Sequence, residues 1–214
     1  MIKRILIKNN SRRGLKQAGF TLMELLIVLA IFTVIMSVAL FNQAGLSSSV
    51  LVTNLAYETA LAIREAQTYG ISVRASSAVN DKFDKGYGVY FEMNSPDRIV
   101  VFGDADNDKI FSDTAELQSL YEIKNQRGNK IKSISYTNSG ELTTLGSGDR
   151  LSIMFKRPNP EAAFYKIDTS GGLIPLTGPI KIIVGNTENT NCRAVVVEIT
   201  GQIRVEQTQC VPTP

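Results

Sequence analysis

The chain of 214 residues contains no histidine and no tryptophan, and it has only two cysteines. Without histidine, a Ser-His-Asp triad and a histidine base that titrates near neutrality are excluded. Two cysteines without histidine also argue against a zinc site. No P-loop is present, and the isolated Gly86-Tyr87-Gly88 is not a phosphate-binding fingerprint. These absences predict that the protein is not an enzyme. The alternative is a membrane-anchored hydrolase that uses a pair of carboxylates. No particular pair of acids in the sequence indicates such a site.

Acidic residues are scarce in the N-terminal region. The first 19 residues contain no acid, and residues 20–41 contain one ionisable side chain, Glu24. A helix over this range rises about 33 Å, enough to cross a hydrocarbon core of about 30 Å. An acid at the centre of such a helix costs about 2.5–3.5 kcal/mol, and less near an end. We therefore expect Glu24 to have a partner.

A cut between Gly19 and Phe20 supplies that partner, because the new α-amino group then lies four residues from Glu24. On a neighbouring copy of the helix, this cation faces the carboxylate. The preceding residues form a cytoplasmic flank in the positive-inside sense. Its cations are Lys3, Arg4, Lys8, Arg12, Arg13 and Lys16.

Three other interpretations compete for the same segment. A secretory signal has an apolar core of about 7–15 residues, shorter than this one, although Ser37-Val38-Ala39 resembles a weak cleavage site. A plain transmembrane anchor fits the length but leaves Glu24 unexplained. A buried helix of a soluble protein fits neither the length nor the basic flank.

The string Gly19-Phe20-Thr21-Leu22, with Glu24 fifth after the break, resembles the class III leader of type IV pilins and pseudopilins. The resemblance implies that a prepilin peptidase cuts after Gly19 and methylates Phe20, and that Glu24 recruits each subunit into a filament. It also implies membrane lipid before assembly, other pilin or pseudopilin subunits, and an inner-membrane assembly platform as partners. The protein would cross the bacterial cytoplasmic membrane once, with its C-terminal domain outside the cytoplasm, and then join a periplasmic or extracellular filament.

Net charge changes sign on this cleavage. The whole chain has 23 Lys and Arg against 20 Asp and Glu, a net charge of +3. Removing the six cations of the leader leaves 17 against 20, a net charge of −3. Bulk charge therefore gives no support to a nucleic-acid-binding domain.

A second helical pattern follows a Gly- and Ser-rich stretch around Gly45, where we expect any bend or local melting. We expect the helix to cover residues 20–70, with 20–41 transmembrane, and to end at Gly70. The apolar stripe favours packing on a sheet over an exposed partner-binding face. The stripe consists of Leu51, Leu55, Ala62, Ile63, Ala66 and Tyr69, and the opposite face of Glu58, Arg64, Glu65 and Gln67.

Beyond Gly70 the pattern changes to short segments of period two, separated by Gly, Pro, Asn and Asp. No further long helix alternates with them, which argues against a doubly wound parallel fold. We expect an α+β fold of the pilin type: a leader over 1–19, the long helix over 20–70, and a mostly antiparallel β-rich head over 71–214. Predicted strands cover 86–93, 98–102, 120–124, 130–137, 150–156, 162–168, 180–184, 193–199 and 202–206.

The last two predicted strands form a hairpin with Thr200-Gly201 at its turn. Pairing Ile199 with Gln202 places Cys192 opposite Gln209, one residue from Cys210. This register predicts a disulfide worth about 3 kcal/mol, and two free thiols are the alternative.

The hairpin and the helix segment before the first strand are also similar to the H-type minor pseudopilins and related minor pilins. Arg64 and Ala66 on the helix, with Gly201 and Arg204 in the hairpin, carry the resemblance. It implies a structural minor subunit of a type II secretion pseudopilus or type IV pilus. Some competence-type relatives bind DNA through Gly-Arg-x-Arg, but here Gln202 replaces the first arginine. The alternative of a tip pilin that binds DNA or a surface ligand thus rests on Arg204.

One loop carries a candidate metal site. Asp104, Asp106 and Asp108 have the spacing that opens an EF-hand-like calcium loop, and Asp113 or Glu116 offers a further carboxylate. Lys109 replaces the turn glycine of that motif, and Ala115 stands at its twelfth position. An acidic surface loop that uses Asp and Asn for turn hydrogen bonds is the alternative. Calcium is thus a candidate ligand, and no other cofactor is expected.

Overall fold

The computed structural model describes residues 19–72, 85–123, 128–138 and 140–210, with the side chains of 41–47 left out. The six leader cations therefore lie outside the described residues, whereas the expected local melting around Gly45 is wrong, because the backbone is helical there. The backbone of α1 (Leu22–Ile71) is continuous helix. The contacts between residues divide the chain into two compact units, Met1–Ala44 and Gly45–Pro214, and each unit is described by itself.

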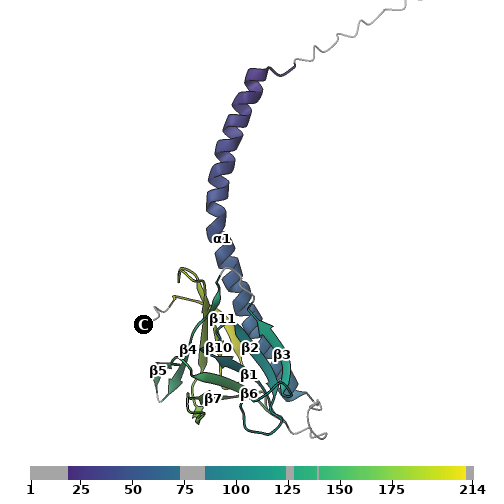
Figure 1. Ribbon diagram of the computed structural model, residues 1–214, viewed down its shortest axis with the longest axis vertical. Helices are drawn as coiled ribbons and strands as arrows, with labels where there is room; N and C mark the ends of the chain where they lie inside the picture. Colours follow the sequence, from purple (N-terminus) through teal and green to yellow (C-terminus); the bar gives the residue numbers. More distant parts are fainter. Residues whose placement is uncertain (1–18, 73–84, 124–127, 139, 211–214) are drawn as a thin grey trace, which may run out of the picture. The chain divides into compact units, whose positions relative to one another are not determined.

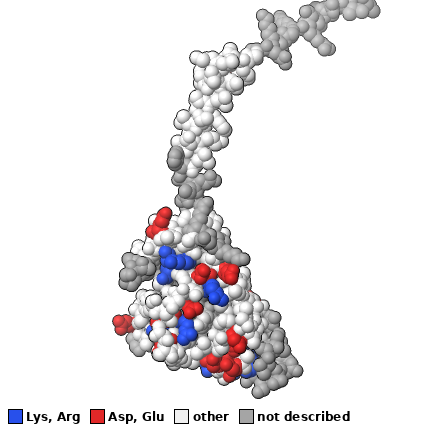
Figure 2. All heavy atoms as spheres, in the orientation of Figure 1, with Lys and Arg blue, Asp and Glu red and all other residues white. Residues whose placement is uncertain are grey.

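The described part of the first unit is the apolar start of α1. Residues Leu22–Leu40 are long and apolar enough to span a membrane, with a mean hydropathy of 2.6, and none of this segment is buried within the protein. The face seen in Figure 2 carries no charged side chain along this part of the helix. Apart from Glu24 the segment is uncharged, and an exposed apolar helix of this length is typical of helices that lipid or neighbouring helices cover.

Two fully antiparallel sheets make up the second unit, together with the later turns of α1 (Figure 1). The first sheet has the order β3 (Leu117–Glu122), β2 (Arg98–Gly103), β1 (Tyr87–Glu92), β6 (Arg150–Phe155), β7 (Ala162–Ile167), β8 (Leu173–Leu176). The second has the order β11 (Ile203–Thr208), β10 (Cys192–Val197), β9 (Ile180–Gly185), β4 (Lys130–Asn138), β5 (Glu141–Thr144). The expected α+β architecture is confirmed.

The main core joins α1 to residues of both sheets. Its helical members follow the predicted stripe, with Leu55, Ile63 and Ala66 buried, and Tyr69 partly buried against them. Strand residues such as Phe91 and Ile182 complete the cluster. The i, i+3/i+4 spacing of these apolar residues therefore fixes which face of α1 packs on the strands.

Two smaller clusters lie apart from this core. One contains Tyr90, Val100 and Phe102, with Ile110 and Phe111 of the acidic loop packed against it. The ring of Phe111 lies 5.9 Å from that of Tyr90 and 6.0 Å from that of Phe102. The acidic loop is therefore anchored on the first sheet by two apolar side chains.

The strand predictions were incomplete in three places. The prediction missed β5, whose four residues are all exposed, and β8, which contains Pro175 and has one buried residue. Neither strand shows the alternation of buried and exposed positions that marks a half-buried strand. The third predicted strand began at residue 120, whereas β3 begins at Leu117.

Candidate functional site

The predicted cleavage site lies in non-helical backbone immediately before α1. Gly19 and Phe20 are exposed, and Phe20 is 86% accessible. Thr21 caps the helix, because its Oγ1 accepts a hydrogen bond of 3.2 Å from the backbone N–H of Glu24. Glu24 is exposed in the first turn, where a carboxylate interacts favourably with the helix dipole.

Sequence reasoning missed the role of Thr21. The pattern Thr21-x-x-Glu24 before an apolar run is the capping-box signature, in which Ser or Thr caps the helix and Glu or Gln follows three residues later. Glu24 therefore occupies a position favourable to the helix of its own chain, in addition to its expected role between chains.

The segment of α1 that carries the Arg64 and Ala66 resemblance contacts the hairpin turn through Gln67. Gln67 Nε2 donates hydrogen bonds to the carbonyl oxygens of Gly201 at 2.9 Å and Pro160 at 3.1 Å. Arg64 donates to Gln67 Oε1 at 2.7 Å. The prediction that Gln67 faces away from the core is wrong: its side chain is 5% exposed, because these two carbonyl groups require a donor.

Glu65 also departs from the predicted polar face. Its carboxylate accepts hydrogen bonds from the hydroxyl groups of Tyr69, Ser119 and Tyr121. The last two lie on β3, so Glu65 ties α1 to the edge of the first sheet. Glu58 and Arg64 are exposed, as predicted for the polar face.

The C-terminal hairpin has a register one residue away from the predicted one. Val197 pairs with Ile203, and Cys192 pairs with Thr208 rather than Gln209. Glu198 and Gln202 close a loop in which Gly201 has a φ of 81°. A type I turn followed by a left-handed glycine forms this kind of three-residue hairpin loop, whereas the prediction assumed two residues.

The predicted disulfide joins Cys192 to Cys210, with 5.2 Å between the two Cα atoms. Cys192 is buried with Ile183, Ala194 and Val196, and Cys210 packs against this cluster. The bridge therefore fastens the end of the chain to an apolar group of the second sheet.

Arg204 lies on β11 between two acids. Its guanidinium pairs with the carboxylates of Glu198 and Glu206. Lys181 also binds Glu206, at 3.1 Å. The hydrogen bond from Lys181 and the charge of Arg204 lower the pKa of Glu206. The cation on which the DNA-binding alternative rests is thus already paired with two acids of the same hairpin.

The acidic loop brings together three of the four predicted metal ligands. One carboxylate oxygen from each of Asp104, Asp106 and Asp108 lies within 4.8 Å of the others. Asp113 lies outside this group, and its Oδ1 accepts a hydrogen bond from the backbone N–H of Ala115 at 2.7 Å. The loop therefore uses Asp113 to form a turn.

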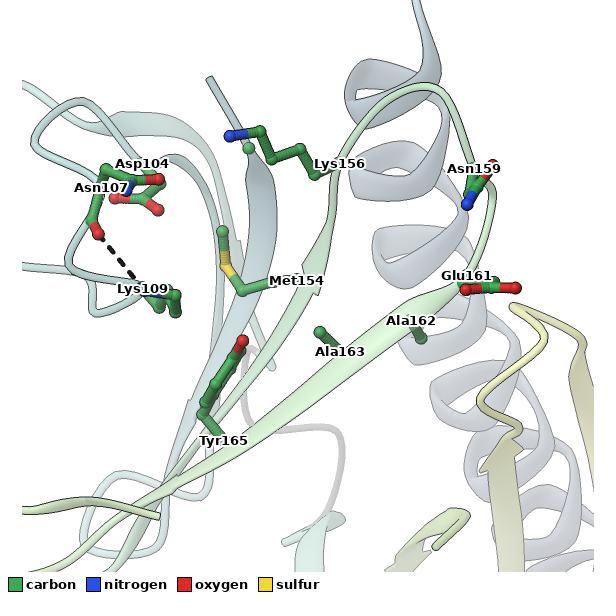
Figure 3. Close-up of a pocket in the computed structure, with 11 residues that line it drawn as sticks. Asp104, Asn107, Lys109, Met154, Lys156, Asn159, Glu161, Ala162, Ala163 and Tyr165 are labelled. Atoms are coloured by element: carbon green, nitrogen blue, oxygen red, sulfur yellow. Dashed lines mark hydrogen bonds between the residues drawn. The ribbon is translucent and has the colours of Figure 1, made fainter. Parts of the chain in front are cut away.

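A cavity of about 260 Å³ opens beside this loop. Figure 3 shows Asp104, Asn107 and Lys109 on one side of it, and Asn159 and Glu161 on the other. The Lys109 ammonium lies 5.9 Å above the ring of Tyr165, another residue of the wall. Charge of both signs lines the cavity, and no catalytic arrangement of nucleophile and base is present among its lining residues.

Comparison with known protein families gives a match at the N-terminal region. Residues 14–40 match the family described as the prokaryotic N-terminal methylation motif. No curated protein and no solved structure matches the chain. The matched range contains Gly19, Phe20 and Glu24 and most of the apolar part of α1. It supports a subunit of the type IV pilin or pseudopilin kind.

Proposed function

We propose that the protein is a minor pseudopilin or pilin, a structural subunit that enters a type II secretion pseudopilus or a type IV pilus after its leader is removed. The match of residues 14–40 to the methylation motif carries the proposal. An exposed apolar helix and a disulfide-bonded β-rich head support it. Before assembly the helix resides in the cytoplasmic membrane, with the head on the far side.

Burial of the apolar helix against its neighbours drives assembly in this proposal. The Phe20 amino group of one subunit pairs with the Glu24 carboxylate of the next, which compensates the cost of placing that carboxylate in an apolar filament core. Since Glu24 is the sole ionisable residue in 20–41, it also sets the axial register between helices.

Processing is tested by co-expressing the full chain with a prepilin peptidase and measuring the mass of the product. We expect loss of residues 1–19 and addition of one methyl group to Phe20. Gly19→Val should block cleavage, whereas Gly14→Val, at the other glycine of the leader, should leave it intact. A full-length product in the wild type, or equal processing of both variants, would refute the proposed leader.

Assembly is tested with Glu24→Gln, followed in the sheared filament fraction of the native host. Glutamine is compatible with a capping box at this position but removes the charge. We expect the processed chain to accumulate in the membrane and to be lost from filaments. Glu58→Gln, on an exposed part of the same helix, is the matched control. Normal incorporation of Glu24→Gln would contradict the pairing.

A further inference from the structure

The acidic loop holds one buried carboxylate oxygen that has no hydrogen-bond donor among the described residues. Asp104 is 1% exposed, and its Oδ1 is buried without a hydrogen-bond partner among the described residues. The same residue contributes an oxygen to the group formed with Asp106 and Asp108. A buried carboxylate oxygen without a donor is costly, and a cation at this point removes the cost.

The neighbouring charges increase that cost. One carboxylate oxygen of each of Asp104, Asp106 and Asp108 lies within 4.8 Å of the others, and like charges this close repel one another. The backbone N–H groups of Lys109 and Asn107 donate hydrogen bonds to the Asp104 carboxylate, but its Oδ1 has no donor. None of the three carboxylates forms an ion pair within the described ranges. Lys109 instead directs its ammonium toward the carbonyl of Asn107 and the ring of Tyr165.

The backbone of the loop already has the curvature that an ion-wrapping loop needs. Asn107 and Lys109 have φ angles of 69° and 68°, in the left-handed region. Lys109 takes the place of the glycine expected at the sixth position of an EF-hand-like loop and adopts the conformation that glycine favours there. Lys109 departs from the glycine of the sequence motif, but the backbone at this position still has the left-handed conformation.

Glu116 fixes the two ends of the loop relative to each other. Its Oε1 accepts a hydrogen bond from the N–H of Ala105, and its Oε2 accepts one from the N–H of Ser112, both at 3.0 Å. The Asp108 carboxylate accepts hydrogen bonds from Ser112 Oγ and from the backbone N–H of Ile110. Glu116 thus holds the two ends of the loop together and lies outside the group of Asp104, Asp106 and Asp108.

We propose that this loop binds a calcium ion through the side chains of Asp104, Asp106 and Asp108. Hard oxygen ligands of this kind suit Ca²⁺, which tolerates irregular geometry and completes its shell with carbonyl groups and water. Mg²⁺ demands a near-ideal octahedron and gives up water reluctantly, so it should bind less well. The site is separate from the assembly contact at Glu24, and it does not depend on the proposed pilin role.

The experiment uses the full chain in detergent, treated with chelator and titrated calorimetrically with CaCl₂ and, separately, MgCl₂. We expect one calcium per chain with a Kd of about 10⁻⁴–10⁻³ M, the range of extracellular calcium modules. At 5 mM free calcium the Tm should rise by about 2–9 °C, because binding to the native state stabilises it.

Three variants locate the site. Asp106→Asn changes an exposed ligand and should abolish the calcium heat, while its Tm in chelator should not fall, because the change removes one of the repelling charges. Asp104→Asn should also abolish binding, although its burial means that its Tm in chelator must be reported alongside. Asp113→Asn is the matched control, since it removes an acid of the same loop outside the group. Absence of calcium heat and of a Tm rise in the wild type, or unchanged affinity in Asp106→Asn, would overturn the proposal.

Discussion

Gln67 Nε2 lies 2.9 Å from the carbonyl oxygen of Gly201 and links α1 to the C-terminal hairpin across 134 positions of the chain. The same nitrogen donates to the carbonyl of Pro160. One amide group therefore satisfies two backbone acceptors that come from separate loops. Helix, β6–β7 connection and hairpin turn meet at this side chain.

Gln67→Ala should destabilise the protein by about 2 kcal/mol, because it leaves these carbonyl groups without their buried donor. Chemical denaturation of the full chain in detergent measures the free energy of unfolding. Asn54→Ala, at an exposed position of the same helix, is the control and should change it little. Equal stability of the two variants would show that Gln67 is not required for packing.

Gly201→Ala should be destabilising for two independent reasons. The residue has a φ of 81°, and an added Cβ would lie 2.0 Å from the Pro160 carbonyl oxygen and 2.5 Å from Gln67 Nε2. The turn must therefore shift, which breaks the Gln67 contacts. Combining Gly201→Ala with Gln67→Ala should cost less than the sum of the two single changes. Strict additivity in this double-mutant cycle would mean that the contacts are not coupled.

The hydrogen bond from Tyr121 to Glu65 predicts a loss of stability at alkaline pH. Burial, followed by the hydrogen bond to Glu65 and its negative charge, raises the pKa of Tyr121 to about 12 from 10.0. A raised pKa in the folded state means that the unfolded chain loses this proton first. The contribution of the Tyr121 hydrogen bond to the free energy of unfolding is therefore complete below pH 10 and is lost as the pH rises to about 12.

The measurement compares the free energy of unfolding between pH 9 and 12 for the wild type and Tyr121→Phe. We expect the variant to be less stable at pH 9 and the difference to shrink as the pH rises, because phenylalanine has no proton to lose. Tyr57→Phe, at an exposed position, should follow the wild type. Parallel curves for Tyr121→Phe and the wild type would contradict the assignment.

Local patterns predicted the helix and most strands, because these depend on the periodicity of nearby residues. Leu55 and Ile63 follow the helical stripe and are buried as expected. Gln67 was misplaced, since its acceptors lie 93 and 134 positions away and no local pattern indicates them. The exposed strand β5 left no pattern for a different reason: all four of its residues are exposed, so no alternation of buried and exposed positions marks it.

The candidate sites show the same division. The spacing of Asp104, Asp106 and Asp108 indicated a shared calcium site. One carboxylate oxygen of each lies within 4.8 Å of the others, and calcium binding itself stays a prediction. The positioning role of Glu116 depends on how the chain returns to β3, which spacing does not give. The disulfide was predicted despite a register error of one residue, because Cys210 lies just beyond the paired strand in either register.

The ion pairs of Arg204 predict that the protein does not bind DNA. Because Glu198 and Glu206 hold its guanidinium, a phosphate must compete with two carboxylates for it. We expect no mobility shift of duplex DNA at low salt and high micromolar protein. Gln202→Arg, which restores the Gly-Arg-x-Arg string of DNA-binding relatives, tests whether the missing cation alone limits binding. A clear shift by the wild type would instead favour the tip-pilin alternative.

The Cys192–Cys210 bridge should contribute about 3 kcal/mol, because it closes a loop with a sequence separation of 18. Replacing both cysteines by alanine should lower the free energy of unfolding by this amount and free the chain end from the cluster of Ile183, Ala194 and Val196. Alanine suits the apolar surroundings of Cys192, so the change isolates the cross-link.

Reduction of the wild type supplies the matched control, since it breaks the same bond without a substitution. Reduced wild type and the double variant should have similar stability, and adding reductant to the double variant should change nothing. Alkylation of the native, unreduced chain followed by mass measurement should find no reactive thiol. Two alkylated cysteines under these conditions would show that the bridge does not form, and the stability of the hairpin would then rest on its strand pairing and on Gln67.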